Sequence, residues 1–175
     1  MKSPDQWLAF LRIVVGVCFL RGGLQKVQWV FLGNIFPLPW VSQRWIHFMP
    51  RRVAEFASHN PISWYREFLT GFVIPHRETF AALVAWGELG AGLGLILGLF
   101  TRFSSAVAFF LGLNFLLATF WLGPCELWFH TLLLSLAAAF LFSGAGHTWG
   151  VDGWLANRLP KISLSRRSSS TTRKV

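Results

Sequence analysis

The stretch Trp86-Gly-Glu-Leu-Gly-Ala-Gly-Leu-Gly-Leu-Ile-Leu-Gly-Leu-Phe-Thr-Arg102 is a run of apolar and small residues that contains one acidic side chain, Glu88. Such a run suits a helix that crosses the hydrocarbon core of a membrane, which is about 30 Å thick. The rest of the chain is similar, since 54% of its 175 residues are hydrophobic, 13% are charged and the mean hydropathy is +0.50. A soluble domain of this size is less apolar, so the composition predicts an integral membrane protein.

Four apolar blocks are long enough to cross the membrane as helices: residues 7–27, 79–99, 103–121 and 128–142. They lack the period-2 alternation of membrane strands, which argues against a β-barrel. The predicted fold class is therefore all-α, an integral membrane four-helix bundle in one domain, residues 1–160. A disordered basic tail, residues 161–175, is expected to follow. Small residues at four-residue spacing, such as Gly90 and Gly94, are expected to pack helix against helix.

The segment between the first two blocks, residues 33–75, is too long for a simple turn and has amphipathic patterns. Pro50 is expected to open one short helix, and Asn60-Pro61 to end it and open a second. Both helices are expected to lie flat in the membrane interface. They would act as a lid over the bundle, as an anchor or as a docking surface.

Lysine and arginine residues indicate the orientation of the chain. Arg102 lies between the second and third blocks and six basic residues follow the fourth, whereas none lies between the third and fourth. Because basic residues favour the cytoplasmic side, both termini are expected in the cytoplasm. The net charge of +9 accompanies no nucleic-acid-binding motif, so membrane lipids are the expected counterions.

Glu88 lies near the middle of its block, where a lone carboxylate is costly. Counting about 1.5 Å per residue from the outer ends of the helices places Glu88 about 13 Å deep and Arg21 about 9 Å deep. We therefore expect Glu88 to pair with Arg21, and Arg12 to extend to the inner surface. Such a pair either fixes the register of two helices or marks a path for protons or substrate.

Other polar side chains are expected near this pair, in the outer half of the bundle: Lys26, Asn114, Cys125, Glu126 and His130. Cys18 and Cys125 belong to no Cys-x-x-Cys motif, which argues against a disulfide relay. Histidines do not lie at one depth on facing helices, as a haem would require. Metal-ligand spacing, a phosphate-binding loop and a dinucleotide fingerprint are also missing from the sequence, so no haem, metal or nucleotide is expected.

Several motifs resemble the DoxX/DoxD family of small four-helix membrane proteins: Phe19-Leu-Arg-Gly-Gly-Leu-Gln-Lys26, Glu88-Leu-Gly-Ala-Gly92, Gly98-Leu-Phe-Thr-Arg102 and Gly144-Ala-Gly-His-Thr-Trp-Gly-Val-Asp152. The long loop and the turn Trp121-Leu-Gly-Pro-Cys-Glu126 are similar to the DoxD branch, the small membrane subunit of thiosulfate:quinone oxidoreductase. The resemblance implies a prokaryotic cytoplasmic membrane or an equivalent organelle membrane. It also implies the quinone pool and a second redox subunit or soluble oxidoreductase as partners.

This resemblance implies a quinone-linked oxidoreductase subunit, with quinone as the candidate substrate. Quinone reduction needs a lipid-accessible pocket, hydrogen-bonding groups and a supply of protons. Glu88 and His130 would deliver the protons. Arg21 would stabilise the negative charge of reduced quinone, and Trp86 would stack on its ring.

An anionic donor such as thiosulfate would be attracted to Lys26 and Arg21. Asn114 and Cys125 are further candidates for substrate binding. The alternative function is a non-catalytic scaffold that anchors soluble redox or stress-response enzymes, with the ion pair as a register device. A small-solute carrier fits less well, because four helices without broken spans or repeats offer no alternating access.

Overall fold

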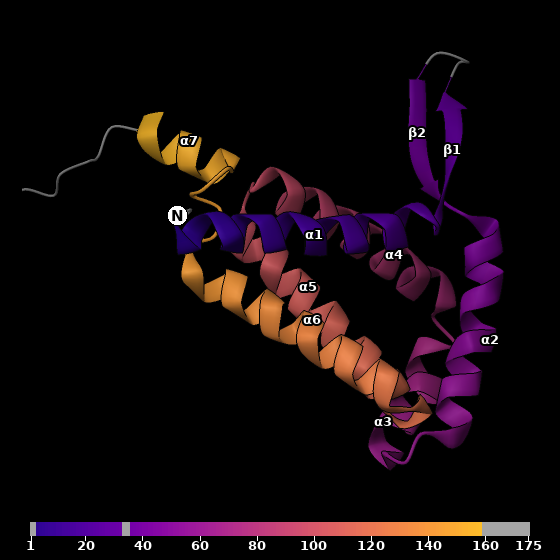
Figure 1. Cartoon of the computed structure of the whole chain (residues 1–175). Helices are drawn as coiled ribbons and strands as arrows, with labels where there is room; N and C mark the ends of the chain where they lie inside the picture. Colours follow the sequence, from indigo (N-terminus) through magenta and orange to yellow (C-terminus); the bar gives the residue numbers. More distant parts are fainter. Residues whose placement is uncertain (1–2, 33–35, 159–175) are drawn as a thin grey trace, which may run out of the picture.

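The computed structural model describes residues 3–32 and 36–158 of the chain. The predicted all-α membrane bundle is confirmed, because the described residues contain four helices that are long and apolar enough to cross a membrane (Figure 1). These are α1 Pro4–Leu24, α4 Arg77–Leu97, α5 Thr101–Thr119 and α6 Pro124–Ser143. A short 3-10 turn, Phe120–Leu122, extends α5. The predicted tail, residues 161–175, lies outside the described residues.

Local sequence explains where these spans begin and end. Proline occupies the first turn of α1 and of α6, where its missing N–H leaves no hydrogen bond unmade. The spans α4 and α6 end at Gly98 and Gly144, whose φ angles of 64° and 65° lie in the left-handed region that glycine adopts without strain. The chain can therefore reverse direction sharply after each of these two helices.

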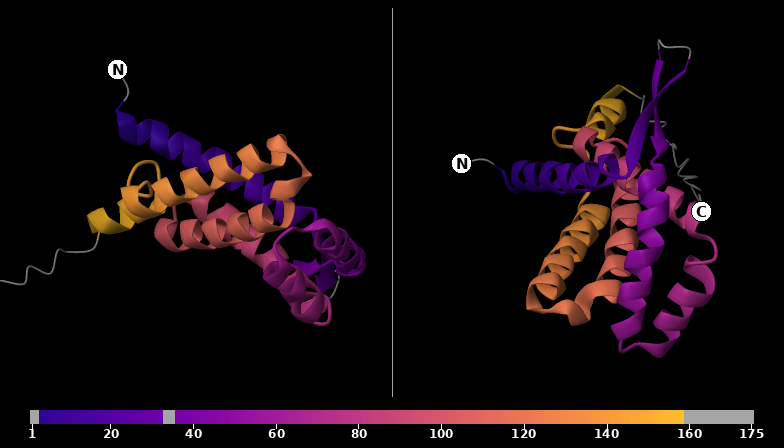
Figure 2. Two further views of the ribbon diagram at one scale, coloured as in Figure 1. Left: turned by 90° about the horizontal axis from the view of Figure 1, so that it is seen from below. Right: turned by 90° about the vertical axis from the view of Figure 1, so that its right-hand side faces the viewer.

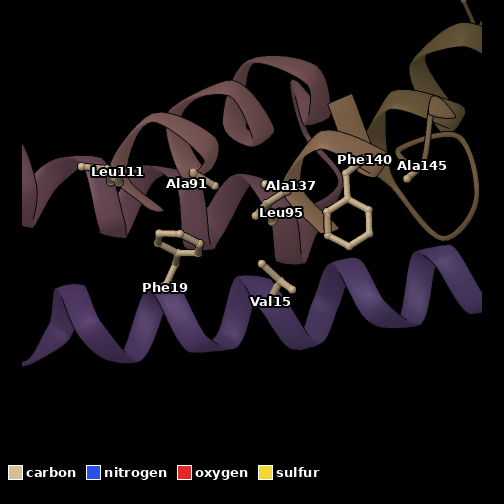
Figure 3. Close-up of a cluster of buried hydrophobic side chains, with 9 residues drawn as sticks. Val15, Phe19, Ala91, Leu95, Leu111, Ala137, Phe140 and Ala145 are labelled. Atoms are coloured by element: carbon tan, nitrogen blue, oxygen red, sulfur yellow. The ribbon is translucent and has the colours of Figure 1, made fainter. Parts of the chain in front are cut away.

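Close packing of α1 on α4 and of α5 on α6 forms the bundle. A Cβ added at Gly92 of α4 would lie 2.5 Å from the backbone nitrogen of Leu20 of α1, so the two backbones touch. Figure 3 shows side chains from α1 and from the later helices meeting in the core. The cluster consists of Val15, Phe19, Ala91, Leu95, Ala108, Leu111, Ala137, Phe140 and Ala145.

The segment between α1 and α4 forms a cap over one end of the bundle. It contains an antiparallel hairpin and two helices: β1 Val27–Leu32, β2 Phe36–Val41, α2 Gln43–His59 and α3 Ser63–Phe68, followed by the π-helical turn Leu69–Val73. The helix α2 lies across the ends of the spans, and the hairpin extends away from the bundle (Figures 1 and 2). We call this the capped end. The opposite end, near α7 Val151–Arg158, is called the α7 end.

The cap is fixed to α4 and α5 by a second core and by hydrogen bonds. The core joins Met49, Ala57 and Tyr65 of the cap to Ala81 and Ala118 of the spans. Three cap side chains also donate to backbone carbonyls of the spans: Trp45 to Ala81 (3.1 Å), Asn60 to Leu117 (2.8 Å) and Tyr65 to Asn114 (2.9 Å). The amphipathic helices expected between the first two spans are thus present, and they cover the bundle as a fixed layer.

The predicted starts of the two cap helices are wrong. Pro50 lies inside α2, which begins at Gln43, because burial of Trp45 and Met49 against the spans extends the helix on the N-terminal side of the proline. The second helix begins at Ser63, not at Asn60-Pro61.

Asn60 delays the second helix because its side-chain oxygen accepts a hydrogen bond from the Ile62 backbone N–H at 2.9 Å, which forms a turn. The hairpin was not predicted, and its first strand takes up the last residue of the block 7–27. Two runs rich in aromatic and β-branched residues around Gly33-Asn34 were the available signal.

Candidate functional site

A largely buried ion pair joins the turn that follows α1 to α4 at the capped end. The Lys26 Nζ donates to Glu88 Oε2 at 2.5 Å and to the Gly22 carbonyl at 3.2 Å, and the two charged side chains are only 16% and 6% exposed. The Lys26 ammonium also lies 5.0 Å from the centre of the Trp45 ring, within cation–π range. Each buried charge therefore has a partner, as burial in an apolar region requires.

The predicted partner of Glu88, Arg21, is wrong. Arg21 is exposed, whereas its neighbours Gly22 and Gly23 contact α4. A Cβ at Gly22 would lie 3.0 Å from Glu88 Oε2, so the missing side chain makes room for the carboxylate. Helical rotation separates neighbouring residues by about 100°, so Arg21 has the right depth but lies on another face of α1.

Arg12 is completely buried near the α7 end. Its Nη1 donates to the Ala145 carbonyl at 3.1 Å and its Nη2 to the Trp149 carbonyl at 3.0 Å. The prediction that Arg12 extends to the inner surface is wrong, because the loop between α6 and α7 folds over the guanidinium. A Cβ at Gly98 would overlap that guanidinium, so glycine is needed there for space as well as for φ.

Asp152 links the same loop to the start of α5. Its carboxylate accepts the backbone N–H groups of Phe100 and Thr101, each at 2.9 Å, and its own N–H donates to the Gly98 carbonyl at 2.9 Å. Burial raises the pKa of Asp152, but hydrogen bonds from Thr101 and Phe100 and the charge of His147 outweigh it, so the pKa lies below its ordinary value. The motifs Gly98–Arg102 and Gly144–Asp152 thus meet in space.

Three other predicted site residues lie apart from the ion pair. His130 is buried in α6, with its Nε2 at 3.6 Å from Glu126 Oε2 on the same helix. The Asn114 amide donates to the Phe110 carbonyl at 2.8 Å, also within its own helix. Cys125 is exposed in the first turn of α6. The structure therefore does not bring the polar groups of all four helices into one cluster.

Trp86 lies on an apolar groove of about 1080 Å³ that follows the outer surfaces of α4 and α5. Along α4 the groove extends from Thr79 to Leu97. At about 1.5 Å per residue this is roughly 27 Å, close to the thickness of the hydrocarbon core. A Cβ added at Gly90, on the wall of the groove, would contact nothing within 4 Å. Intramolecular packing thus leaves this space free.

A smaller polar pocket of about 410 Å³ lies at the α7 end, where the sequence predicted no site. Its polar lining consists of Thr101, Arg102, His147 and Asp152. All four belong to the motifs Gly98–Arg102 and Gly144–Asp152 that carried the family resemblance, but their proximity depends on the fold. Within residues 3–32 and 36–158, no group of His, Cys, Asp and Glu side chains is arranged to hold a metal ion.

Comparison with models of known families identifies the family of this chain. The model of the family described as TQO small subunit DoxD matches residues 7–171, which contain the cap, α4 to α7 and nearly all of α1. No solved structure matches the chain.

Proposed function

Since the chain belongs to the DoxD family of TQO small subunits, we propose that it is the membrane subunit of a quinone-linked oxidoreductase of the thiosulfate:quinone type. A second redox subunit completes the complex in this proposal. An anionic sulfur donor gives up two electrons, and membrane quinone takes them up with two protons to become quinol. The termini and the α7 end lie in the cytoplasm, and the capped end lies on the outer side.

The groove on α4 and α5 carries this proposal. Quinone reaches an enzyme from within the bilayer, so its site must open to lipid and accept a long apolar tail. The groove runs along nearly the whole span, and its walls are formed almost entirely by apolar side chains. Trp86 presents an aromatic surface there, and the free space at Gly90 gives a flat ring or a prenyl chain access to the helix backbone.

The ion pair has a different role in this proposal. Glu88 faces Gly22 of α1, whereas Gly87 and Gly90 on another face of α4 line the groove. Lys26 and Glu88 therefore hold α1, α4 and the cap together. Proton delivery by Glu88 and His130 stays a prediction.

The test is to measure the quinone that remains bound to the protein after gentle purification and lipid extraction. Wild type and Gly90→Ala are expected to retain quinone, whereas Gly90→Leu is expected to lose most of it because the larger side chain fills the groove. Gly90→Ala is the matched control, since both variants lose the glycine. Wild-type protein without quinone, or equal retention in both variants, contradicts the proposal.

The outer face of α2 favours a second candidate function, a scaffold that docks a soluble partner. Arg44, His47 and Arg51 are exposed at helical spacing on this fixed helix. Within the described residues Arg52 pairs with Glu55 at 2.7 Å, while Arg44 and Arg51 form no ion pair. An acidic oxidoreductase that copurifies with wild type but not with Arg44→Glu/Arg51→Glu, in protein free of quinone, would favour the scaffold.

A further inference from the structure

The apolar groove and the polar pocket at the α7 end are adjacent. Phe100 and Phe103 line both of them. Phe100 immediately precedes α5 and has a φ of 47°, a conformation that its hydrogen bond to Asp152 holds in place. The two neighbouring spaces thus offer an apolar channel along the span and a polar compartment where the span ends.

The polar compartment offers hydrogen-bond donors. Thr101 is 2% exposed, and its hydroxyl forms no hydrogen bond of good geometry with any described residue, although it lies close enough to Asp152 to lower the pKa of that carboxyl. His147 is exposed to water and adds a ring nitrogen. A buried hydroxyl without a good partner is uncommon and favours a ligand that accepts its proton.

The charge of the compartment distinguishes between ligand heads. The Asp152 carboxylate lines it and would repel a lipid phosphate, although Arg102 reduces this repulsion. A neutral head with carbonyl oxygens meets no such penalty and can accept hydrogen bonds from Thr101 and His147.

The length of the groove distinguishes between ligand tails. An acyl chain of a phospholipid fills one leaflet, about 15 Å of a core that is about 30 Å thick. The groove continues along α4 through both leaflets, from Leu97 near the polar compartment to Thr79 at the capped end. A polyprenyl chain can follow such a path, whereas a single acyl chain leaves the distal half empty.

We propose that the compartment lined by Thr101 and His147 holds the head of the quinone, and that the groove between α4 and α5 holds its polyprenyl tail. This inference rests on the proposed function. It places the quinone head at the α7 end, away from Glu88, and gives Thr101 a direct contact with a quinone carbonyl.

The test uses a photoreactive azidoquinone with a prenyl tail, bound to the full chain in lipid nanodiscs and mapped by mass spectrometry. The label is expected on peptides that contain Phe100–Phe103 and Gly144–Asp152, and excess unlabelled quinone is expected to prevent it. Thr101→Val should weaken binding about tenfold, the effect of losing one hydrogen bond of about 1.4 kcal/mol. Ser105→Ala is the matched control, because the Ser105 hydroxyl is also buried without a described partner but lines neither space.

The possible outcomes separate this inference from the proposed function. A label near Thr79 and Trp86 overturns the inference and leaves the proposed function standing. A label that anionic phospholipid displaces but quinone does not assigns the compartment to a lipid, which also overturns it. The lack of any label that quinone prevents contradicts both proposals. If Thr101→Val does not fold, His147→Phe is used instead, and unchanged binding in that variant overturns the inference.

Discussion

Each end of the bundle holds a cation from the first part of the chain, Arg12 within α1 and Lys26 in the turn that follows it, but the two ends satisfy these cations in different ways. At the capped end Lys26 pairs with the carboxylate of Glu88. At the α7 end Arg12 donates to the backbone carbonyls of Ala145 and Trp149, and it forms no ion pair with any described residue. One cation is therefore held by an opposite charge and the other by the shape of a loop.

This difference follows from the chemistry of the two side chains. The planar guanidinium of arginine can reach two acceptors at fixed angles, whereas the lysine ammonium acts as a compact charge. The stability of the capped end should therefore depend mainly on charge. The stability of the α7 end should depend mainly on the geometry of the hydrogen-bond donors of Arg12, even when the positive charge is kept.

The largest effect is expected at Arg12. Arg12→Met removes two charge-assisted hydrogen bonds and leaves two buried carbonyls without donors, which should lower the free energy of unfolding by about 3 kcal/mol. Arg12→Lys keeps the charge but cannot span both carbonyls, so it should be almost as unstable. Thermal unfolding in detergent measures both. A lysine variant as stable as wild type would show that the α7 end depends on charge after all.

A smaller loss is expected at Glu88. Glu88→Gln leaves Lys26 partly buried without its counterion, which should lower the free energy of unfolding by about 2 kcal/mol. The double variant Lys26→Gln/Glu88→Gln should recover part of this loss, because no unpaired charge remains. The bound quinone should be unchanged in every variant that folds. A stable Glu88→Gln protein that has lost quinone would support the proton role instead.

The sequence predicts the spans well because hydropathy depends only on local composition. It predicts the depth of Glu88 for a similar reason, since each helical residue advances by a fixed rise. It does not show which face of α1 meets α4. That face turns Arg21 away from Glu88 and leaves Lys26, just after the helix, as the partner of the carboxylate. Gly22 and Gly23 carried a usable signal, because small residues in a membrane helix mark the face that contacts a neighbour.

The α7 end was harder to predict. Arg12 and Ala145 are separated by 133 positions in the sequence, and no periodic pattern connects them. The groove was equally hard to predict from the sequence, because glycines on the same helix have different surroundings. Gly92 touches α1, whereas Gly90 faces open space, and only the packed structure separates these two roles.

A moderate effect is expected at Tyr65, which fixes the cap to the spans. Tyr65→Phe removes its hydrogen bond to the Asn114 carbonyl and should lower the free energy of unfolding by about 1 kcal/mol. Hydrogen exchange should increase in α2 and α3 while the α7 end stays protected. Equal increases at both ends would show that the two ends do not loosen independently.

The titration of Tyr65 gives an independent check that this side chain is buried between the cap and the spans. Burial raises the pKa of Tyr65 from 10.0 to about 12. The unfolded chain therefore ionises first, and wild type should lose stability as the pH rises from 10.0 towards 12. Tyr65→Phe should lack this loss. Tyrosinate absorbance reports the ionisation directly, because the chain has one tyrosine.

The smallest effect is expected at Asp152, and it tests whether charge contributes anything at the α7 end. The lowered pKa of Asp152 means that its ionised form stabilises the fold above the ordinary value of 3.8, and that this contribution disappears as the pH falls through the lower folded pKa. Asp152→Asn should be less stable than wild type at neutral pH, and the difference should shrink in acid. Asp5→Asn, in the exposed first turn of α1, is the matched control for the loss of one carboxylate. A difference that stays constant with pH would mean that Asp152 acts at the α7 end by its shape, as Arg12 does, and not by its charge.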